Sequence, residues 1–256
     1  MTDDRRLSVP APAPARPSLI VAIDGPSGSG KSSVSREVAR RLGMRYLDTG
    51  AMYRAVCWSC LNGGVDLADT TAVADHARAL SLGLRTDPDA PGVLVAGTDV
   101  SAAIRETRIS TAVSAVATNL AVREELRRRQ REIIDDAVAA GIGIVTEGRD
   151  ITTVVAPDAL VRILLTADER ARLTRRALEV HGSTAAAALD ATRDQVLRRD
   201  ADDATVASFH EAADGVLALN SSALTFDQTV EVVLGVIAQR TTPVRDESPD
   251  VVTAAP

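Results

Sequence analysis

One glycine-rich segment constrains the fold of this 256-residue chain more than any other feature. It follows an apolar, β-branched run at 18–24 and opens a helical pattern at 31–42. The segment consists of Gly25, Pro26, Ser27, Gly28, Ser29, Gly30, Lys31, Ser32 and Ser33. Up to Ser32 it fits G-x-x-x-x-G-K-[ST], a phosphate-binding loop that connects a strand to a helix. Glycines let backbone N–H groups turn toward an anion, so these residues are predicted to bind the phosphates of a nucleoside triphosphate.

The lysine of this loop has no counterpart elsewhere in the chain. Among the 29 basic residues, 28 are arginines and Lys31 is the one lysine. As a compact charge it suits the β- and γ-phosphates, and the hydroxyl of Ser32 suits Mg²⁺. The alternative is a glycine-rich turn without a ligand. A chain with a single lysine at the position that the motif requires favours the phosphate loop.

The rest of the pattern predicts an α/β fold. Short apolar runs alternate with helical patterns, which is typical of a parallel sheet covered by helices on both faces. We expect a P-loop three-layer fold with a roughly five-stranded parallel sheet. Strands are predicted at 18–24, 45–48, 142–147, 160–166 and 215–219, and helices at 31–42, 51–61 and 226–239.

Two stretches interrupt this alternation. Residues 63–120 contain small strands near 82–85 and 93–96 and then an Ala/Ser/Thr-rich helix, so they are predicted to form an inserted subdomain. Residues 180–204 follow an arginine-rich helix and are predicted to form a short lid, with a solvated helical hairpin as the alternative. The domain is expected to span 18–240, with its core at 18–62 and 121–240. The Pro/Ala-rich arm at 1–17 and the tail at 241–256 are expected to be disordered.

Composition excludes several classes of protein. A formal charge of −6 argues against a protein that binds duplex nucleic acid. Apolar stretches such as 19–23 are far shorter than the roughly 20 residues that a membrane span needs. The N-terminus has no apolar segment typical of a secretory signal, and the two cysteines cannot make a disulfide framework. We therefore expect a cytoplasmic protein that binds neither nucleic acid nor membranes.

Other proteins with a phosphate loop need motifs that this chain lacks. The guanine-reading N-K-x-D motif needs a second lysine, and no sequence resembles the L-S-G-G-Q signature. A small phosphotransferase with an acceptor-binding insert and a lid remains. Such an enzyme must bring two polyanions together, so basic groups should converge on the site. Any one arginine is more often a surface residue, but Arg149 follows a predicted strand at the carboxyl edge where open α/β sheets bind ligands.

Five strings carry a resemblance to a known family: IDGPSGSGKSS at 23–33, YLDTGAMYRA at 46–55, VREELRRRQR at 122–131, EGRDITTVVAPDA at 147–159 and RRDADDAT at 198–205. Together they are similar to the bacterial cytidylate (CMP) kinases over residues 19–237. The resemblance implies transfer of the γ-phosphoryl group of ATP to CMP or dCMP, with Mg²⁺, in a nucleoside-monophosphate kinase. It also implies a CMP-binding insert and a short lid, with ATP and CMP or dCMP as the molecules bound. We expect a monomer.

The matching motifs also imply roles for individual residues. The residues implied to read cytosine are Ser114, Arg123 and Asp150. The CMP-binding set further includes Thr49, with Arg54 and Arg149 for the phosphate and Asp203 for a ribose hydroxyl. The catalytic set is Lys31, Arg149, Arg172, Arg175 and Arg199.

The chain departs from the family pattern at three places. Val206 stands where an arginine serving the acceptor phosphate is expected, and Arg198 is a neighbour that can substitute for it. The usual S-P-L is here Ser208-Phe209-His210, and Asn220 replaces an aspartate; both changes are interpreted as structural. Two alternatives stay open: a nucleotide-binding paralogue that is catalytically weakened by changes such as Val206, and another small-molecule P-loop kinase with a different acceptor.

Two further patterns are explained by structure alone, with no role in function. Cys57 and Cys60 have C-x-x-C spacing but lie in an apolar helical pattern, so a buried helix face is expected. The arginines at 127–129 lie in a predicted helix with Glu124, Glu125 and Glu132, and a solvated face with ion pairs is expected there.

Overall fold

The computed structural model describes residues 19–183 and 185–242. The predicted arm at 1–17 and the predicted tail beyond residue 242 lie outside these residues. No helix in the described part of the chain is both long and apolar enough to cross a membrane.

The central sheet has five parallel strands, as predicted. They are β1 (Ile20–Asp24), β2 (Arg45–Asp48), β6 (Ile144–Gly148), β7 (Val161–Thr166) and β8 (Leu217–Asn220). Their order is β2-β6-β1-β7-β8, and every neighbouring pair is parallel. The inner strands are buried on both faces, which explains why they appear in the sequence as continuous apolar runs.

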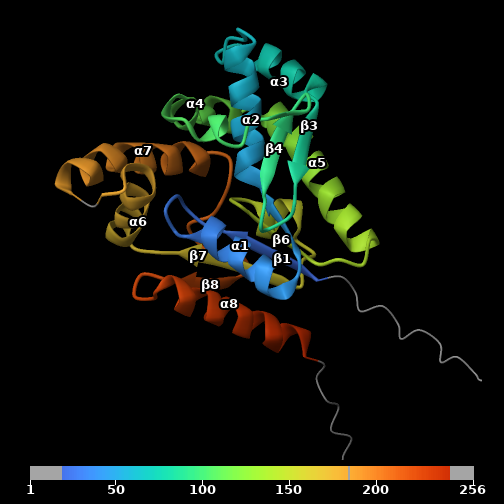
Figure 1. Cartoon of the computed structure of the whole chain (residues 1–256), viewed down its shortest axis with the longest axis vertical. Coiled ribbons are helices and arrows are strands. Elements are labelled where there is room, and N and C mark those ends of the chain that lie inside the picture. Colours follow the sequence, from blue (N-terminus) through green and yellow to red (C-terminus); the bar gives the residue numbers. More distant parts are fainter. Residues whose placement is uncertain (1–18, 184, 243–256) are drawn as a thin grey trace, which may run out of the picture.

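Helices cover both faces of this sheet, so that the sheet and the helices on its two sides form three layers (Figure 1). On one face, Val21 and Ile23 of β1 pack into an apolar cluster with α1 (Lys31–Leu42) and α8 (Phe226–Thr241). On the other face, Ala22 and Ile144 belong to a cluster with α2 (Thr49–Asn62) and α5 (Leu120–Ala139). Alternate residues of a strand point to opposite faces, so one strand serves both clusters.

A second, smaller sheet lies within the predicted insert. It is antiparallel and consists of β3 (Leu82–Arg85), β4 (Gly92–Val95) and β5 (Thr98–Asp99). Around it lie α3 (Thr70–Ala79), the short η1 (Ala103–Arg105) and α4 (Thr107–Ala117). Val93 and Val95 of β4 pack against Ala51 and Ala55 of α2, which joins this sheet to the core. The limits 63–120 of the insert stay a prediction.

Two long helices follow β7 and lie side by side on one flank of the molecule (Figure 1). They are α6 (Glu169–His181) and α7 (Ala186–Ala204). The predicted lid at 180–204 covers the end of α6, the connection and α7, and residue 184 in that connection lies outside the described residues. That this segment acts as a lid stays a prediction.

Helix ends differ slightly from the predicted ones. Helix α2 begins at Thr49 because the side chain of Asp48 accepts a hydrogen bond from the backbone N–H of Ala51 at 2.8 Å. Helix α8 continues to Thr241, past the predicted end at residue 239.

Candidate active site

The site lies where the parallel strands end. Strands β1, β2 and β6 end at Asp24, Asp48 and Gly148, and parallel strands bring these ends to one edge of the sheet. The phosphate loop, the start of α2 and Arg149 therefore follow strands that are neighbours in the sheet. This topology explains why motifs that are about 100 residues apart in the sequence form one site.

The phosphate loop needs glycine for its path. Gly28 and Gly30 adopt positive φ values of 75° and 89°, which residues with a side chain rarely adopt. A Cβ atom on Gly28 would lie 2.5 Å from the backbone oxygen of Arg172 on α6. The loop is thus both tightly curled and in close contact with α6, and α1 starts directly after Gly30.

A cavity of about 580 Å³ opens beside this loop. The predicted site residues that line it are Ser27, Gly28, Gly30, Lys31, Ser32, Ser33, Thr49, Arg54, Arg123, Arg149, Asp150, Arg199 and Asp203. Basic side chains outnumber acidic ones in the lining, although the whole chain carries a net charge of −6. A site of this charge is suited to phosphates.

At the loop end of the cavity, Lys31 lies near a buried carboxylate. The Lys31 ammonium donates a hydrogen bond to the carbonyl of Pro26 at 3.3 Å, and the Ser32 hydroxyl donates one to Glu147 Oε1 at 2.7 Å. Burial and the neighbouring Asp48 raise the pKa of Glu147. Burial lowers the pKa of Lys31 to about 8. Glu147 was missed by the sequence analysis, although it lies near the carboxyl end of β6, two residues before Arg149, and the same carboxyl-edge rule points to it.

At the other end, two arginines of α5 hold Asp150. Arg123 is buried and donates to Asp150 Oδ2 at 2.7 Å. Arg127 donates to the same oxygen from Nε at 3.0 Å and from Nη2 at 2.7 Å. The predicted solvated face is thus confirmed for Arg128, which pairs with glutamates in solvent. It is wrong for Arg127, and also for Arg129, whose side chain is only 16% exposed and donates to the backbone carbonyls of Leu80 and Ala77. The sequence shows the helix but not which of its faces meets the loop after β6.

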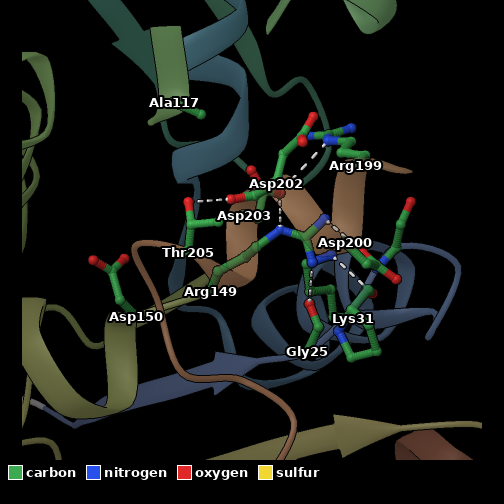
Figure 2. A network of polar contacts seen from close by, with 12 residues as sticks. Gly25, Lys31, Ala117, Arg149, Asp150, Arg199, Asp200, Asp202, Asp203 and Thr205 are labelled. Atoms are coloured by element: carbon green, nitrogen blue, oxygen red, sulfur yellow. Dashed lines mark hydrogen bonds and ion pairs between the residues drawn. The ribbon is translucent and has the colours of Figure 1, made fainter. Parts of the chain in front are cut away.

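Arg149 is the centre of a second charged network (Figure 2). Its Nε lies 2.5 Å from Asp203 Oδ2, its Nη2 lies 3.2 Å from Asp200 Oδ1, and its Nη1 donates to the Gly25 carbonyl at 3.2 Å. The two aspartates come from α7 and are buried. Arg199 lies 3.8 Å from Asp203, and burial, together with the charge of Arg149, lowers the pKa of Arg199 to about 10.

Two predicted catalytic arginines lie behind the loop, outside the cavity lining. Arg172 of α6 pairs with Asp200 and donates to the Ser27 carbonyl at 3.0 Å. Arg175 donates to the carbonyls of Ser29 at 3.2 Å and Ser221 at 2.7 Å. Both side chains therefore tie α6 to the backbone of the phosphate loop.

The remaining predicted residues take several positions. Gly25, Pro26 and Ser29 form the loop without entering the lining. Ser114 is half-buried on α4 and is also absent from it, whereas Ser110, Val113 and Ala117 of the same helix are present. Thr49 donates its hydroxyl to the Glu147 carbonyl at 2.8 Å, and Arg54 pairs with Asp48 at 2.8 Å. Val206 is half-buried and outside the lining.

The C-x-x-C pair forms part of the core. Cys57 and Cys60 are both buried on α2 in the cluster on that face of the sheet, which confirms the predicted buried helix face. Burial raises the pKa of Cys57 to about 11, so its reactive thiolate is rare at neutral pH.

The chain is similar to known proteins over most of its length. The family model for cytidylate kinase matches residues 21–239. The chain belongs to the cytidylate kinase family. The cytidylate kinase of Rhodococcus opacus is 49% identical over 229 residues, which cover 87% of this chain and 96% of that protein. The cytidylate kinase of Streptomyces avermitilis is 44% identical over 225 residues, covering 88% and 94% of the two chains. That of Cutibacterium acnes is 46% identical over 222 residues, covering 86% and 96%.

Proposed function

We propose that this protein transfers the γ-phosphoryl group of ATP to CMP or dCMP and releases ADP with CDP or dCDP. Family membership supports the proposal, and so does a cavity that joins the phosphate loop to a buried Arg–Asp pair. ATP phosphates bind in the loop with Lys31, and the acceptor occupies the rest of the cavity. We further propose that the enzyme is a cytoplasmic monomer.

The observation that supports this choice of acceptor is the hydrogen bonding of the Asp150 carboxylate. Its three hydrogen bonds from Arg123 and Arg127 all fall on Oδ2, which leaves Oδ1 for a donor on the base. Cytosine presents an amino donor at position 4. Uracil has an oxygen acceptor there, which a carboxylate repels. Ser114 completes the proposed base-reading set if α4 turns its side chain toward the cavity.

At the other end of the acceptor, Arg54 and Arg149 hold the CMP phosphate and Asp203 a ribose hydroxyl. An arginine has five N–H groups, and three of those on Arg149 have partners among the described residues. The attacking phosphate oxygen is already ionised at neutral pH, so no general base is needed. Catalysis is then alignment of the two phosphates and charge neutralisation by Lys31 and arginines. We assign Arg172, Arg175 and Arg199 to keeping the loop and the lid in position.

Mg²⁺ fits the residues beside Lys31. Ser32 and Glu147 are hydrogen-bonded to each other and supply hydroxyl and carboxylate oxygens, the ligand types that Mg²⁺ takes together with ATP phosphates. Bound there, Mg²⁺ would neutralise charge on the transferring phosphoryl group.

The test is acceptor selection in Asp150→Asn. We expect the wild type to have a higher kcat/KM for CMP than for UMP. In the variant, the ratio of the two kcat/KM values should fall at least about tenfold, because a neutral amide no longer repels the uracil oxygen. KM for ATP should not change. Asp158→Asn is the matched control, since that aspartate pairs with Arg131 on the surface. An unchanged CMP/UMP ratio in Asp150→Asn would contradict the proposed site.

Val206 supports a second candidate function, a nucleotide-binding protein with weakened transfer. Tight CMP binding without turnover in the wild type, together with turnover gained in Val206→Arg, would establish that alternative. The proposal expects turnover in the wild type.

A further inference from the structure

Phe209 is a large aromatic residue that is buried apart from the main apolar clusters. It is 0% exposed and lies between α7 and β8. Yet it belongs to none of the three clusters of apolar side chains that the described residues form. A residue of this size is ordinarily buried against other apolar groups. Its surroundings therefore call for another explanation.

The ring faces the guanidinium of Arg149. The guanidinium carbon lies 4.6 Å from the centroid of the Phe209 ring, within the roughly 6 Å range of a cation–π interaction. The ring of the next residue, His210, lies 4.6 Å from the same ring between centroids, tilted by 34°. The side chain of Arg149 is only 13% exposed, and cation–π attraction is stronger where water is excluded.

This contact restrains Arg149 in a way that its hydrogen bonds do not. The contacts with Asp203, Asp200 and Gly25 act on N–H groups, which lie in the plane of the guanidinium. An aromatic face resists tilting of that plane. It also keeps water from one side of a cation whose polar partners are two carboxylates and a backbone carbonyl.

We propose that Phe209 is a positioning residue that holds the Arg149 guanidinium in the orientation needed for the acceptor phosphate. The replacement of the family's S-P-L by Ser208-Phe209-His210 then has a functional consequence. This inference rests on the proposed role of Arg149 in binding the CMP phosphate.

The chain offers an unusually clean test, because it contains only two phenylalanines. The other, Phe226, is 47% exposed at the start of α8 and does not line the main cavity. In a Phe226→Leu background, fluorinated phenylalanines supplied during expression enter position 209 alone. Fluorine withdraws electrons from the ring face and weakens the attraction for a cation while leaving the shape of the ring nearly unchanged.

We expect kcat/KM for CMP to fall stepwise with each added fluorine, by roughly tenfold over the series, as loss of a desolvated cation–π contact predicts. KM for ATP should stay nearly constant, and the melting temperature should fall by no more than about a few degrees, as expected for the loss of one such contact. Phe209→Leu should show the same loss of kcat/KM for CMP, and Phe209→Tyr, which keeps the ring face, should recover most of it.

Two results would overturn the inference, and they differ in what else they imply. If the fluorinated series is flat while Arg149→Ala lowers CMP turnover, the ring only fills space and the proposed function stands. If Arg149→Ala leaves CMP turnover unchanged, the proposed role of Arg149 fails, and the role of Phe209 fails with it.

Discussion

Lys31 shows how the site sets the charge of a single residue. The ammonium lies close to Glu147 and Asp48, which favour its charged form, and to Arg149 and Arg199, which oppose it. Burial is the largest influence and lowers the pKa of Lys31 to about 8. Its charge is therefore present at neutral pH but close to being lost.

This predicts a pH effect on ATP use. A lysine with its pKa near 8 is protonated below that pH and neutral above it. We expect kcat/KM for ATP, which reports the pKa values of the free enzyme, to fall as pH rises through about 8. Initial rates at limiting ATP between pH 6.5 and 9.5 give the profile.

Lys31→Arg is the control, because a guanidinium keeps its charge over this range. We expect the variant to be far less active and its profile to lack the fall near pH 8. The same inflection in the variant would assign the titration to another group.

At the scale of elements, Asp24 ties the end of β1 to the segment that follows Arg149 and Asp150. Its carboxylate accepts hydrogen bonds from the backbone N–H groups of Ile151 at 3.0 Å and Thr152 at 2.8 Å, and from the Thr152 hydroxyl at 2.6 Å. Residues Ile151–Val155 form η2, a single π-helical turn. Asp24 thereby anchors the turn that directly follows Asp150, the carboxylate that we propose reads the base.

Burial makes this aspartate sensitive to pH. It raises the pKa of Asp24 from 3.8 to about 6, against the effect of its hydrogen bonds. A raised pKa favours the protonated folded state, so the contribution of Asp24 to the free energy of unfolding is full below about pH 4 and is lost as pH rises through 6. The difference between the two pKa values corresponds to about 3 kcal/mol.

We therefore expect the free energy of unfolding of the wild type, minus that of Asp24→Asn, to decrease between pH 4 and pH 7. Urea unfolding at several pH values measures it. Asp75→Asn serves as the control, because the Asp75 side chain is 68% exposed. The free energy of unfolding of the wild type, minus that of Asp75→Asn, should lack this decrease. A flat curve for Asp24→Asn would show that Asp24 has the same pKa in the folded and unfolded states.

At the scale of the whole molecule, the architecture was predictable because its signals are periodic and local. The apolar runs predict the five strands of the parallel sheet, and the motif at 25–32 predicts a sharp turn between the first strand and α1. The orientation of side chains between distant elements left no such signal. The positions of Arg127 against Asp150 and of Arg172 and Arg175 behind the loop follow from how α5 and α6 dock, which depends on packing over the whole molecule.

The same packing gathers basic residues from distant segments into one cavity. Arg54 on α2, Arg123 on α5 and Arg199 on α7 all line it, while the chain as a whole is acidic. Two anionic substrates can therefore be attracted to one place on a negatively charged protein.

The most direct test of the account is the rate of ADP release from ATP with CMP, dCMP, UMP, AMP or shikimate as acceptor, against water alone. We expect CMP and dCMP to give much higher turnover than the other three acceptors. A strong preference for another acceptor would indicate a different small-molecule kinase. CMP turnover no faster than hydrolysis in water would contradict the proposed function.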